Sequence, residues 1–209
     1  MSDPNPNPNP FQAWNERYGT DEFFYGTEPN DFLREQVAAL PKSGRVLFLA
    51  EGEGRNAVWF ASQAPEAQVL GIDGSIAGLE KAQKLATKCG VQIHTQVADL
   101  NHWDLGTEAF DAVISIWVHM PTALRAELHS RVVQALKPGG VFLLEAYTPK
   151  QLTYKTGGPP VIEMLMTLDA LKSELKGLTF EIAQEKDRVI HEGRGHDGLS
   201  AVVQVLCRK

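Results

Sequence analysis

Residues 45–50, Arg-Val-Leu-Phe-Leu-Ala, run directly into residues 51–56, Glu-Gly-Glu-Gly-Arg-Asn, and this junction decides the fold. The apolar run predicts a buried strand, and Gly52 and Gly54 let the backbone turn sharply where a Cβ would block a ligand. The helix expected over 55–64 repeats its apolar residues at helical spacing, and its first N–H groups point at the turn. Strand, turn and helix together predict a nucleotide-cofactor site.

A second expected strand, 68–73, ends in Asp73, which lies 21 residues after Gly52. At this spacing an acidic side chain accepts hydrogen bonds from ribose hydroxyls. Residues 52–57 also satisfy the G-x-G-x-x-A pattern of dinucleotide sites. NAD and S-adenosylmethionine both carry an adenosine, so these features fit both cofactors.

The charges beside the turn separate the two cofactors. Glu51 and Glu53 flank Gly52. A pyrophosphate favours a helix N-terminus without negative charge, whereas a sulfonium and an ammonium favour nearby carboxylates. The charge pattern therefore favours S-adenosylmethionine over NAD.

Composition limits the protein class and its partners. The chain has 209 residues, which fits one domain, and 20 basic against 26 acidic residues give a net charge of −6. No basic cluster suggests a nucleic-acid partner, and no apolar stretch is long enough to predict a membrane span or a secretory leader. Cys89 and Cys207 lie too far apart in sequence to suggest a disulfide framework. We expect a cytoplasmic protein that binds a small molecule, and the oligomeric state is left open.

The N-terminal region divides into two parts. Residues 1–10 repeat Asn-Pro and predict an extended tail outside the fold. Residues 11–25 are dense in aromatic side chains, so we expect them to cover part of the single domain formed by 11–209. Asn30 then predicts the N-cap of a helix that runs to Leu40 and is stopped by Pro41.

The rest of the chain alternates between strand and helix patterns. Strands are expected at 45–50, 68–73, 91–98, 110–117 and 141–147, with helices at 55–64, 76–88 and 122–136. A tight turn is expected at Lys137-Pro-Gly-Gly140. A helical segment near 169–176 precedes two long strands, 178–189 and 199–208, which are expected to pair antiparallel. The pattern predicts an α/β, Rossmann-like, doubly wound sheet of seven strands, mostly parallel with an antiparallel C-terminal hairpin.

Together these motifs resemble class I S-adenosylmethionine-dependent methyltransferases over residues 11–209. The matching segments are 50–56, Asp73, Val97-Ala-Asp-Leu100, 110–116 and Leu136-Lys-Pro-Gly-Gly140. One departure is Glu53, where the family commonly has a glycine or cysteine. The resemblance implies that an acid after the second strand holds the ribose and that Asp99 with Leu100 reads the adenine. The cofactor residues that it implies are Glu51, Gly52, Gly54, Asn56, Asp73, Gly74, Ser75, Asp99, Leu100, Ser115 and Ile116.

Within this class the chain is similar to the thiopurine and tellurite-resistance methyltransferase group. The similarity rests on Trp14-Asn-Glu-Arg-Tyr18, on Tyr25-Gly26 and on the Gly-Gly-Pro-Pro loop at 157–160. In that group N-terminal aromatic residues lie over the methyl donor. The resemblance implies that Trp14 and Tyr18 cover the cofactor and that Arg17 binds the methionine carboxylate. A core-filling role for these aromatic residues is the alternative.

Methyl transfer needs little acid–base machinery, because the acceptor only has to be held in line with the methyl group. His119 follows the fourth expected strand at the carboxyl edge of the sheet and is the candidate base for a hard acceptor. Residues 191–196, His-Glu-Gly-Arg-Gly-His, do not have the helical spacing of a zinc motif, and they predict a hairpin turn and no metal. Candidates for binding the acceptor are Tyr25, Tyr147, Tyr154, Arg188 and His196.

The sequence therefore predicts an S-adenosylmethionine-dependent methyltransferase that acts on a small soft nucleophile, such as a thiol, a selenium or tellurium species, or a thiopurine-like compound. Two alternatives remain open. One is an NAD-dependent oxidoreductase, which the glycine pattern permits. The other is a non-catalytic domain that binds a nucleoside and regulates a partner.

Overall fold

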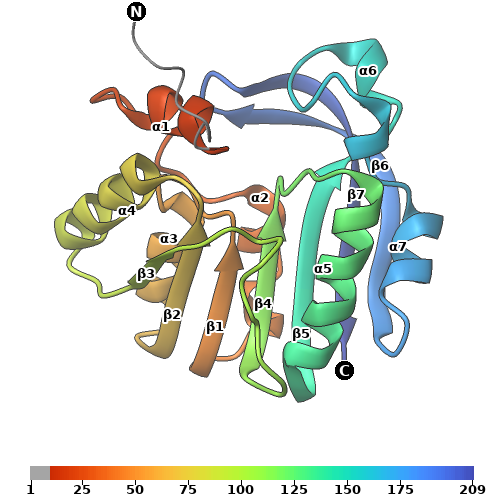
Figure 1. Cartoon of the computed structure of the whole chain (residues 1–209), viewed down its shortest axis with the longest axis horizontal. Coiled ribbons are helices and arrows are strands. Elements are labelled where there is room, and N and C mark those ends of the chain that lie inside the picture. The colour runs from red at the N-terminus through yellow and green to blue at the C-terminus, as the bar shows by residue number, and fades with distance from the viewer. Residues whose placement is uncertain (1–9) are drawn as a thin grey trace, which may run out of the picture.

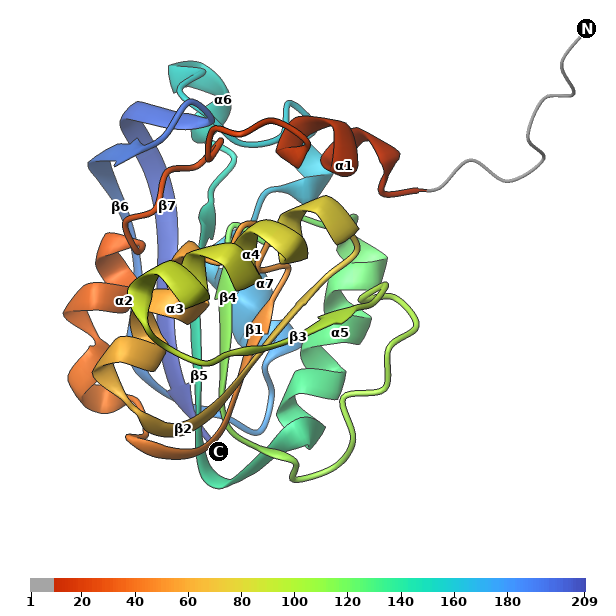
Figure 2. The ribbon, with the colours of Figure 1, turned by 90° about the vertical axis from the view of Figure 1, so that its left-hand side faces the viewer.

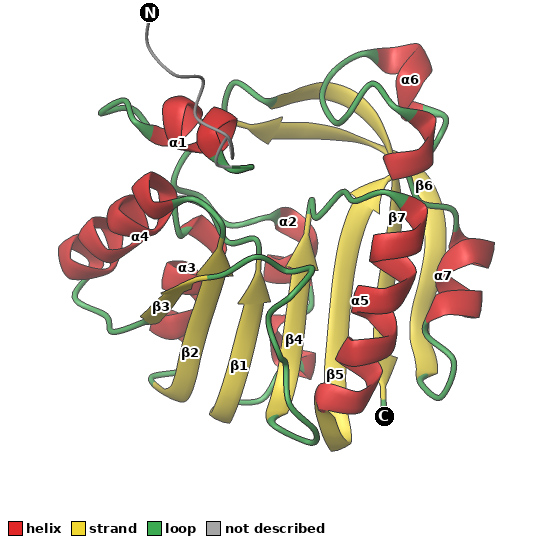
Figure 3. Ribbon diagram, in the orientation of Figure 1, coloured by secondary structure: helices red, strands yellow, loops and turns green. Residues whose placement is uncertain are grey.

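The computed structural model describes residues 10–209, so almost all of the expected 1–10 tail lies outside the described part of the chain. Seven strands form one sheet in the order β3-β2-β1-β4-β5-β7-β6 (Figures 1 and 3). Their bounds are β1 Ser43–Leu49, β2 Glu66–Asp73, β3 His94–Val97, β4 Phe110–Ile116, β5 Leu136–Tyr147, β6 Thr179–Glu192 and β7 His196–Arg208.

The first five strands pair parallel to one another, and β7 pairs antiparallel with both β5 and β6. This confirms the predicted sheet and its reversed C-terminal hairpin. Strand order changes direction at β1 and β4, whose carboxyl ends are adjacent because Leu49 pairs with Ser115. Ligands of open α/β sheets bind beside such a reversal.

Helices cover both faces of the sheet (Figure 2). Side chains of β1 alternate between the faces, since Leu47 and Leu49 join one core cluster while Val46 and Phe48 join the other. The first cluster includes residues of α5 and α7, and the second includes residues of α2, α3 and α4. The helix bounds are α2 Asp31–Glu35, α3 Arg55–Gln63, α4 Ile76–Cys89, α5 Thr122–Ala135 and α7 Leu168–Glu174.

Three further features lie above the carboxyl ends of the parallel strands in Figure 1: α1 (Gln12–Tyr18), α6 (Gln151–Tyr154) and the tip of the β6–β7 hairpin. The N-terminal segment and the hairpin tip are joined directly, because Arg194 N–H donates to the Phe24 carbonyl at 2.9 Å. Segments from the two ends of the described chain therefore form one cover over the sheet edge.

Several local expectations differ from the structure: β3 covers only His94–Val97 of the expected 91–98, and the hairpin strands extend to Glu192 and begin at His196. Asn30 caps a helix as predicted, through Leu33 N–H at 3.0 Å, but the helix ends at Glu35 and a 3₁₀ turn follows at Val37–Ala39. Leu40 is extended, as the residue before a proline usually is, and it ends the 3₁₀ turn. The fifth strand begins at Leu136 rather than 141, since Leu136 pairs with Phe110 before the register shifts. Helix α6 had no sequence signal.

None of the described helices is long and apolar enough to cross a membrane. Within residues 10–209 no group of three or more His, Cys, Asp or Glu side chains could hold a metal ion.

Candidate functional site

A cavity of about 600 Å³ lies at the carboxyl edge of the parallel strands, under α1. Its volume is in the range of small-molecule and cofactor sites. The predicted site residues that line it are Trp14, Arg17, Tyr18, Tyr25, Glu51, Asn56, Asp73, Gly74, Asp99, Leu100, Ile116, His119 and His196.

Glu51, Glu53 and Arg55, which flank the two glycines of the turn, line one wall of this cavity, whereas Gly52 and Gly54 themselves do not line it. Gly52 has a φ of +59°, and a Cβ built there would lie 2.9 Å from the Tyr18 hydroxyl oxygen. Gly54 has a φ of +92° and precedes α3, where a Cβ would lie 2.6 Å from Ala82. Glycine is therefore required at both positions. Gly52 allows the N-terminal segment to approach, and Gly54 allows α3 to pack on α4.

Glu51 lies at the N-terminus of α3 and accepts hydrogen bonds from the N–H groups of Asn56 at 3.0 Å and Ala57 at 2.7 Å. Burial raises the pKa of this carboxyl to about 7, against the lowering effect of those bonds and of Arg55. The cavity wall thus holds a carboxyl group that a cationic ligand would readily ionise.

Glu53 has a different environment. Its carboxylate lies 2.5 Å from Lys81 Nζ and accepts the Phe24 N–H at 2.8 Å. The two predicted carboxylates therefore divide their roles, since Lys81 neutralises Glu53 while no Lys or Arg forms an ion pair with Glu51 among the described residues.

Asp73 braces the turn as well as facing the cavity. One carboxylate oxygen accepts the Gly52 N–H at 2.8 Å and the other accepts the Ser75 N–H at 2.7 Å. Each oxygen keeps a second lone pair, which leaves room for ribose hydroxyls. Ser75 does not line the cavity, because its hydroxyl caps α4 through Gly78 N–H and donates to Asn15.

The N-terminal aromatic segment packs onto the cavity wall. A Cβ on Gly74 would lie 2.2 Å from the Phe11 ring, so that ring occupies the space above residue 74. The Arg17 guanidinium lies over the rings of Trp14 at 4.5 Å and Phe24 at 4.9 Å, and it forms no ion pair with a described carboxylate. A partly exposed cation in this position is suited to an anionic group of a ligand.

At the adenine end, one Asp99 oxygen accepts the Asn101 N–H at 2.9 Å and the other lies 3.0 Å from His102 Nδ1, so each oxygen keeps a second lone pair, as in Asp73. Asn101 also lines the cavity, and its Oδ1 is buried without a hydrogen bond to any described residue. This acceptor fits a donor carried by a ligand, such as an exocyclic amine. The sequence analysis missed Asn101, although it follows the Asp99-Leu100 pair directly.

Two residues at this edge adopt left-handed backbone conformations without being glycine. Ala50 follows β1 with a φ of +47°, and Trp117 follows β4 with a φ of +59°. Both line the cavity. Such conformations cost about 1–2 kcal/mol and concentrate at binding sites. Trp117 was not among the residues expected from the sequence.

His119 lines the cavity, but both of its ring nitrogens contact the backbone. Nδ1 lies 3.1 Å from the Trp117 carbonyl, and Nε2 accepts the Tyr147 N–H at 3.1 Å. Burial lowers the pKa of His119 to about 4. A neutral imidazole with its lone pair already used is poorly suited to accept a proton, so this geometry argues against the predicted role as a base.

A stack of flat side chains lies beside His119. The ring centroid of Trp117 is 4.5 Å from that of Tyr147 and 4.9 Å from that of His196, with interplanar angles of 22° for both pairs. The ring centroid of Tyr25 lies 4.8 Å from that of His196, with an interplanar angle of 45°. Three of these four rings line the cavity, whereas Tyr147 lies behind them.

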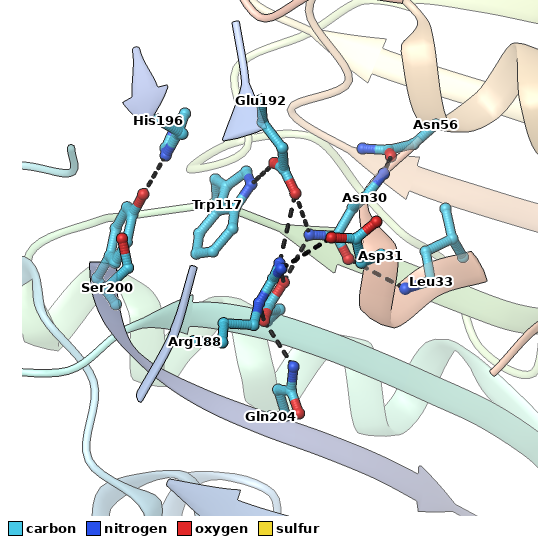
Figure 4. A network of polar contacts seen from close by, with 12 residues as sticks. Asn30, Asp31, Leu33, Asn56, Trp117, Arg188, Glu192, His196, Ser200 and Gln204 are labelled. Carbon is cyan, nitrogen blue, oxygen red and sulfur yellow. Dashed lines mark hydrogen bonds and ion pairs between the residues drawn. The ribbon is translucent and has the colours of Figure 1, made fainter. Parts of the chain in front are cut away.

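Behind the stack lies a buried polar network (Figure 4). Glu145 is fully buried in β5 and receives paired hydrogen bonds from Arg188, both at 2.8 Å. Glu192 binds Arg55 and the Trp117 indole N–H, each at 2.6 Å. Burial opposes ionisation of Glu192, but Arg55 and Trp117 outweigh it and lower its pKa.

The network connects the stack to the rest of the fold. Asn30 donates to both carboxylates, at 2.5 Å to Glu145 and 2.9 Å to Glu192. It therefore ties the segment before α2 to β5 and β6. Arg188, predicted to bind the acceptor, belongs to this network and does not line the cavity.

The remaining predicted residues lie outside the cavity wall. Ser115 is buried in β4, and Tyr154 donates to Asp187 at 2.8 Å near the surface. Residues 191–196 form the predicted hairpin turn, since Glu192 pairs with His196 across it.

Comparison with known proteins agrees with this geometry. Residues 46–140 match a family described as a methyltransferase domain. The ubiquinone/menaquinone biosynthesis C-methyltransferase UbiE of Desulfotalea psychrophila is 31% identical over 150 residues, which are 68% of this chain. The chain spans 60% of the length of that relative.

Solved structures show the same fold. A protein from a study of the conversion of a disulfide bond into a thioacetal group in echinomycin biosynthesis superposes with a TM-score of 0.73 at 20% identity, covering 95% of this chain and 89% of that one. TehB from Haemophilus influenzae superposes with a TM-score of 0.69 at 17% identity, covering 95% and 66%. The sequence matches imply S-adenosylmethionine as the cofactor.

Proposed function

We propose that this chain is a class I S-adenosylmethionine-dependent methyltransferase that transfers a methyl group to a small soft nucleophile. The observation that carries this proposal is the covered cavity, in which Glu51 and Asp73 lie at one end and a stack of flat side chains lies at the other. When bound, S-adenosylmethionine would supply a methyl group from its sulfonium. A lone pair of the acceptor would form the new bond to the methyl carbon, and the sulfur would depart as S-adenosylhomocysteine.

The residues of the cavity fit the parts of this donor. Asp73 would accept hydrogen bonds from the ribose hydroxyls, and Asn101 with Leu100 would hold the adenine. Glu51 would face the cationic methionine end. Arg17 would bind the methionine carboxylate, because its charge is not paired with any described carboxylate.

The N-terminal segment would cover the donor and exclude water. Phe11 and Tyr18 contact the glycine positions 74 and 52 directly, so this cover lies where the donor would bind. Phe11→Ala tests this role, since it removes the ring that lies above residue 74 and should weaken donor binding. Donor affinity equal to that of the wild type in Phe11→Ala would argue against a cover formed by Phe11.

The acceptor is proposed to be a thiol, a selenium or tellurium species, or a thiopurine-like compound. A thiolate or another soft anion reacts without a base, and the one predicted base, His119, has both nitrogens occupied. The echinomycin-pathway neighbour, which acts at sulfur, is consistent with such chemistry.

Two assays test the proposal. Calorimetry should detect binding of S-adenosylhomocysteine and no binding of NADH, because the acidic turn disfavours a pyrophosphate. An acceptor screen with labelled S-adenosylmethionine should find thiols and inorganic tellurite methylated faster than amines or alcohols of similar size. Tight NADH binding would favour an oxidoreductase, and donor binding without turnover on any acceptor would favour a regulatory domain.

A further inference from the structure

His196, the first residue of β7, is held by neighbours from three other elements. Its side chain is nearly buried, at 5% exposure, and its ring lies between Tyr25 and the parallel rings of Trp117 and Tyr147. A backbone bridge to Gly157 fixes the main chain at this point. The ring orientation is therefore set by packing on both sides.

The two ring nitrogens of His196 differ in their surroundings. Nδ1 makes a short hydrogen bond with the hydroxyl of Tyr147, which lies behind the cavity wall. Nε2, on the opposite edge of the ring, has no hydrogen-bond partner among residues 10–209. It is also not fully buried. Since His196 lines the cavity, Nε2 is the atom available to a ligand.

The tyrosine fixes which nitrogen carries the proton. Burial and the charges of Glu192 and Glu145 raise the pKa of the Tyr147 hydroxyl, so it remains protonated at neutral pH. We assign the hydroxyl as the donor and Nδ1 as the acceptor, because an imidazole nitrogen is a stronger hydrogen-bond acceptor than a phenol oxygen. A neutral ring that accepts at Nδ1 carries its proton on Nε2, which makes Nε2 a hydrogen-bond donor.

Burial keeps this ring neutral, and positively charged neighbours act in the same direction. Burial lowers the pKa of His196 to about 3, and Arg55, His119 and Arg17 act in the same direction, while Glu192 opposes them. Glu192 is itself paired with Arg55 at 2.6 Å. The acceptor end of the cavity therefore presents a fixed donor close to two guanidinium groups.

Building on the proposed function, we infer that the Nε2–H of His196, oriented by Tyr147, recognises the negative charge of an anionic acceptor. His196 is then a specificity-determining residue, and Tyr147 is a positioning residue that acts through it. A donor in this place favours a thiolate over a neutral compound of the same shape, and it does not remove a proton.

The tautomer can be measured on the free protein. Long-range ¹H–¹⁵N correlation spectra of ¹⁵N-histidine-labelled protein give the protonated nitrogen of each ring, and His196→Gln identifies the signals of residue 196. We expect His196 as the Nε2–H form in the wild type and a mixture of tautomers in Tyr147→Phe. An Nδ1–H form in the wild type would overturn the inference.

Recognition of charge can be measured by calorimetry on protein saturated with S-adenosylhomocysteine. The probes are 4-nitrobenzenethiolate and its neutral methyl thioether, which share one ring. His196→Leu should weaken thiolate binding roughly ten- to a hundredfold and leave thioether binding unchanged, while His196→Gln, which keeps a donor, should retain most of the affinity. His94→Gln, on the exposed strand β3, is the control for a histidine outside the cavity.

The outcomes separate this inference from the proposed function. Equal losses for both probes, or no loss for either, would overturn the role of His196, as would a wild type that does not bind the thiolate. Absence of S-adenosylhomocysteine binding would overturn the proposed function instead, and the tautomer experiment would still decide the geometry of the Tyr147–His196 pair.

Discussion

Replacing Glu51 with glutamine should uncouple donor binding from pH. The side chain caps α3 through Oε1, which accepts the N–H groups of Asn56 and Ala57. The amide oxygen of glutamine can accept the same two bonds, so Glu51→Gln removes the ionisation and keeps the cap.

The magnitude follows from the pKa, which rises from 4.5 to about 7 in the folded protein. At 1.36 kcal/mol per pKa unit, the difference corresponds to about 3 kcal/mol. Because the folded pKa is the higher one, the folded state takes up a proton, and this contribution is fully present below pH 4.5. It is lost as pH rises to 7, so wild-type stability should fall relative to Glu51→Gln across that range.

Donor binding should show the opposite trend. A sulfonium and an ammonium favour the ionised carboxylate, so binding below pH 7 must first remove the proton, and affinity should fall about tenfold per pH unit. Glu51→Gln should bind S-adenosylmethionine more weakly at pH 8 and independently of pH between 5.5 and 8.

Calorimetric titration with S-adenosylmethionine across this pH range, together with urea unfolding of the free proteins, measures both trends. S-adenosylhomocysteine is the matched ligand without the sulfonium charge, and its binding should depend less on Glu51. A wild-type affinity that is flat from pH 5.5 to 7, with Glu51→Gln binding equally well at pH 8, would refute the assignment of Glu51 to the cationic end of the donor.

Three further variants test other parts of the structure. Asp73→Ala should weaken S-adenosylhomocysteine binding at least tenfold in calorimetry, because the ribose contacts are lost. It should also lower the free energy of unfolding by about 1–3 kcal/mol, because the hydrogen bonds that brace the turn are lost. Glu145→Leu should cost about 3–5 kcal/mol in urea unfolding by leaving a buried guanidinium without its main partner, whereas Lys150→Ala, which breaks an exposed ion pair, should leave the unfolding midpoint unchanged. His119→Leu should lower turnover on a thiol less than tenfold, and a loss in the roughly 10²–10⁴-fold range would restore it as a base.

The order of elements could be predicted from the sequence because each strand and helix has a local signal. Residues 46–50 are continuously apolar, and Asn30 is an N-cap residue whose side chain forms the expected cap. Boundaries that depend on pairing could not be predicted. The extension of β5 to Leu136 exists only because Phe110 lies opposite.

Glu51 and Asp73, which line the cavity, could be predicted because they belong to one strand–turn–helix–strand unit. Tyr25 and His196 also line it as expected, but the polar network behind them could not be predicted, because it is assembled from distant parts of the chain. Glu145 and Glu192 meet Asn30 and Arg55 only in the folded protein. One signal was present and was missed, namely a glutamate within the otherwise apolar run 141–147.

Predicting His119 as a base illustrates a further limit of sequence reasoning. Position along the chain placed it correctly at the carboxyl edge and beside the cavity. Its protonation and free lone pairs depend on backbone groups of residues 117 and 147, which no local pattern shows. His196 lay in a predicted turn, and its contact with Tyr147 depends on the antiparallel pairing of β7 with β5.

The most direct test is transfer of a labelled methyl group from S-adenosylmethionine to a thiol by the purified protein, with Asp73→Ala measured alongside. The account predicts a labelled thioether and one equivalent of S-adenosylhomocysteine per turnover, with a rate at subsaturating donor that falls at least tenfold in Asp73→Ala. Transfer to amines or alcohols with none to thiols or tellurite would contradict the proposed acceptor, and equal rates for the two proteins would contradict the donor site.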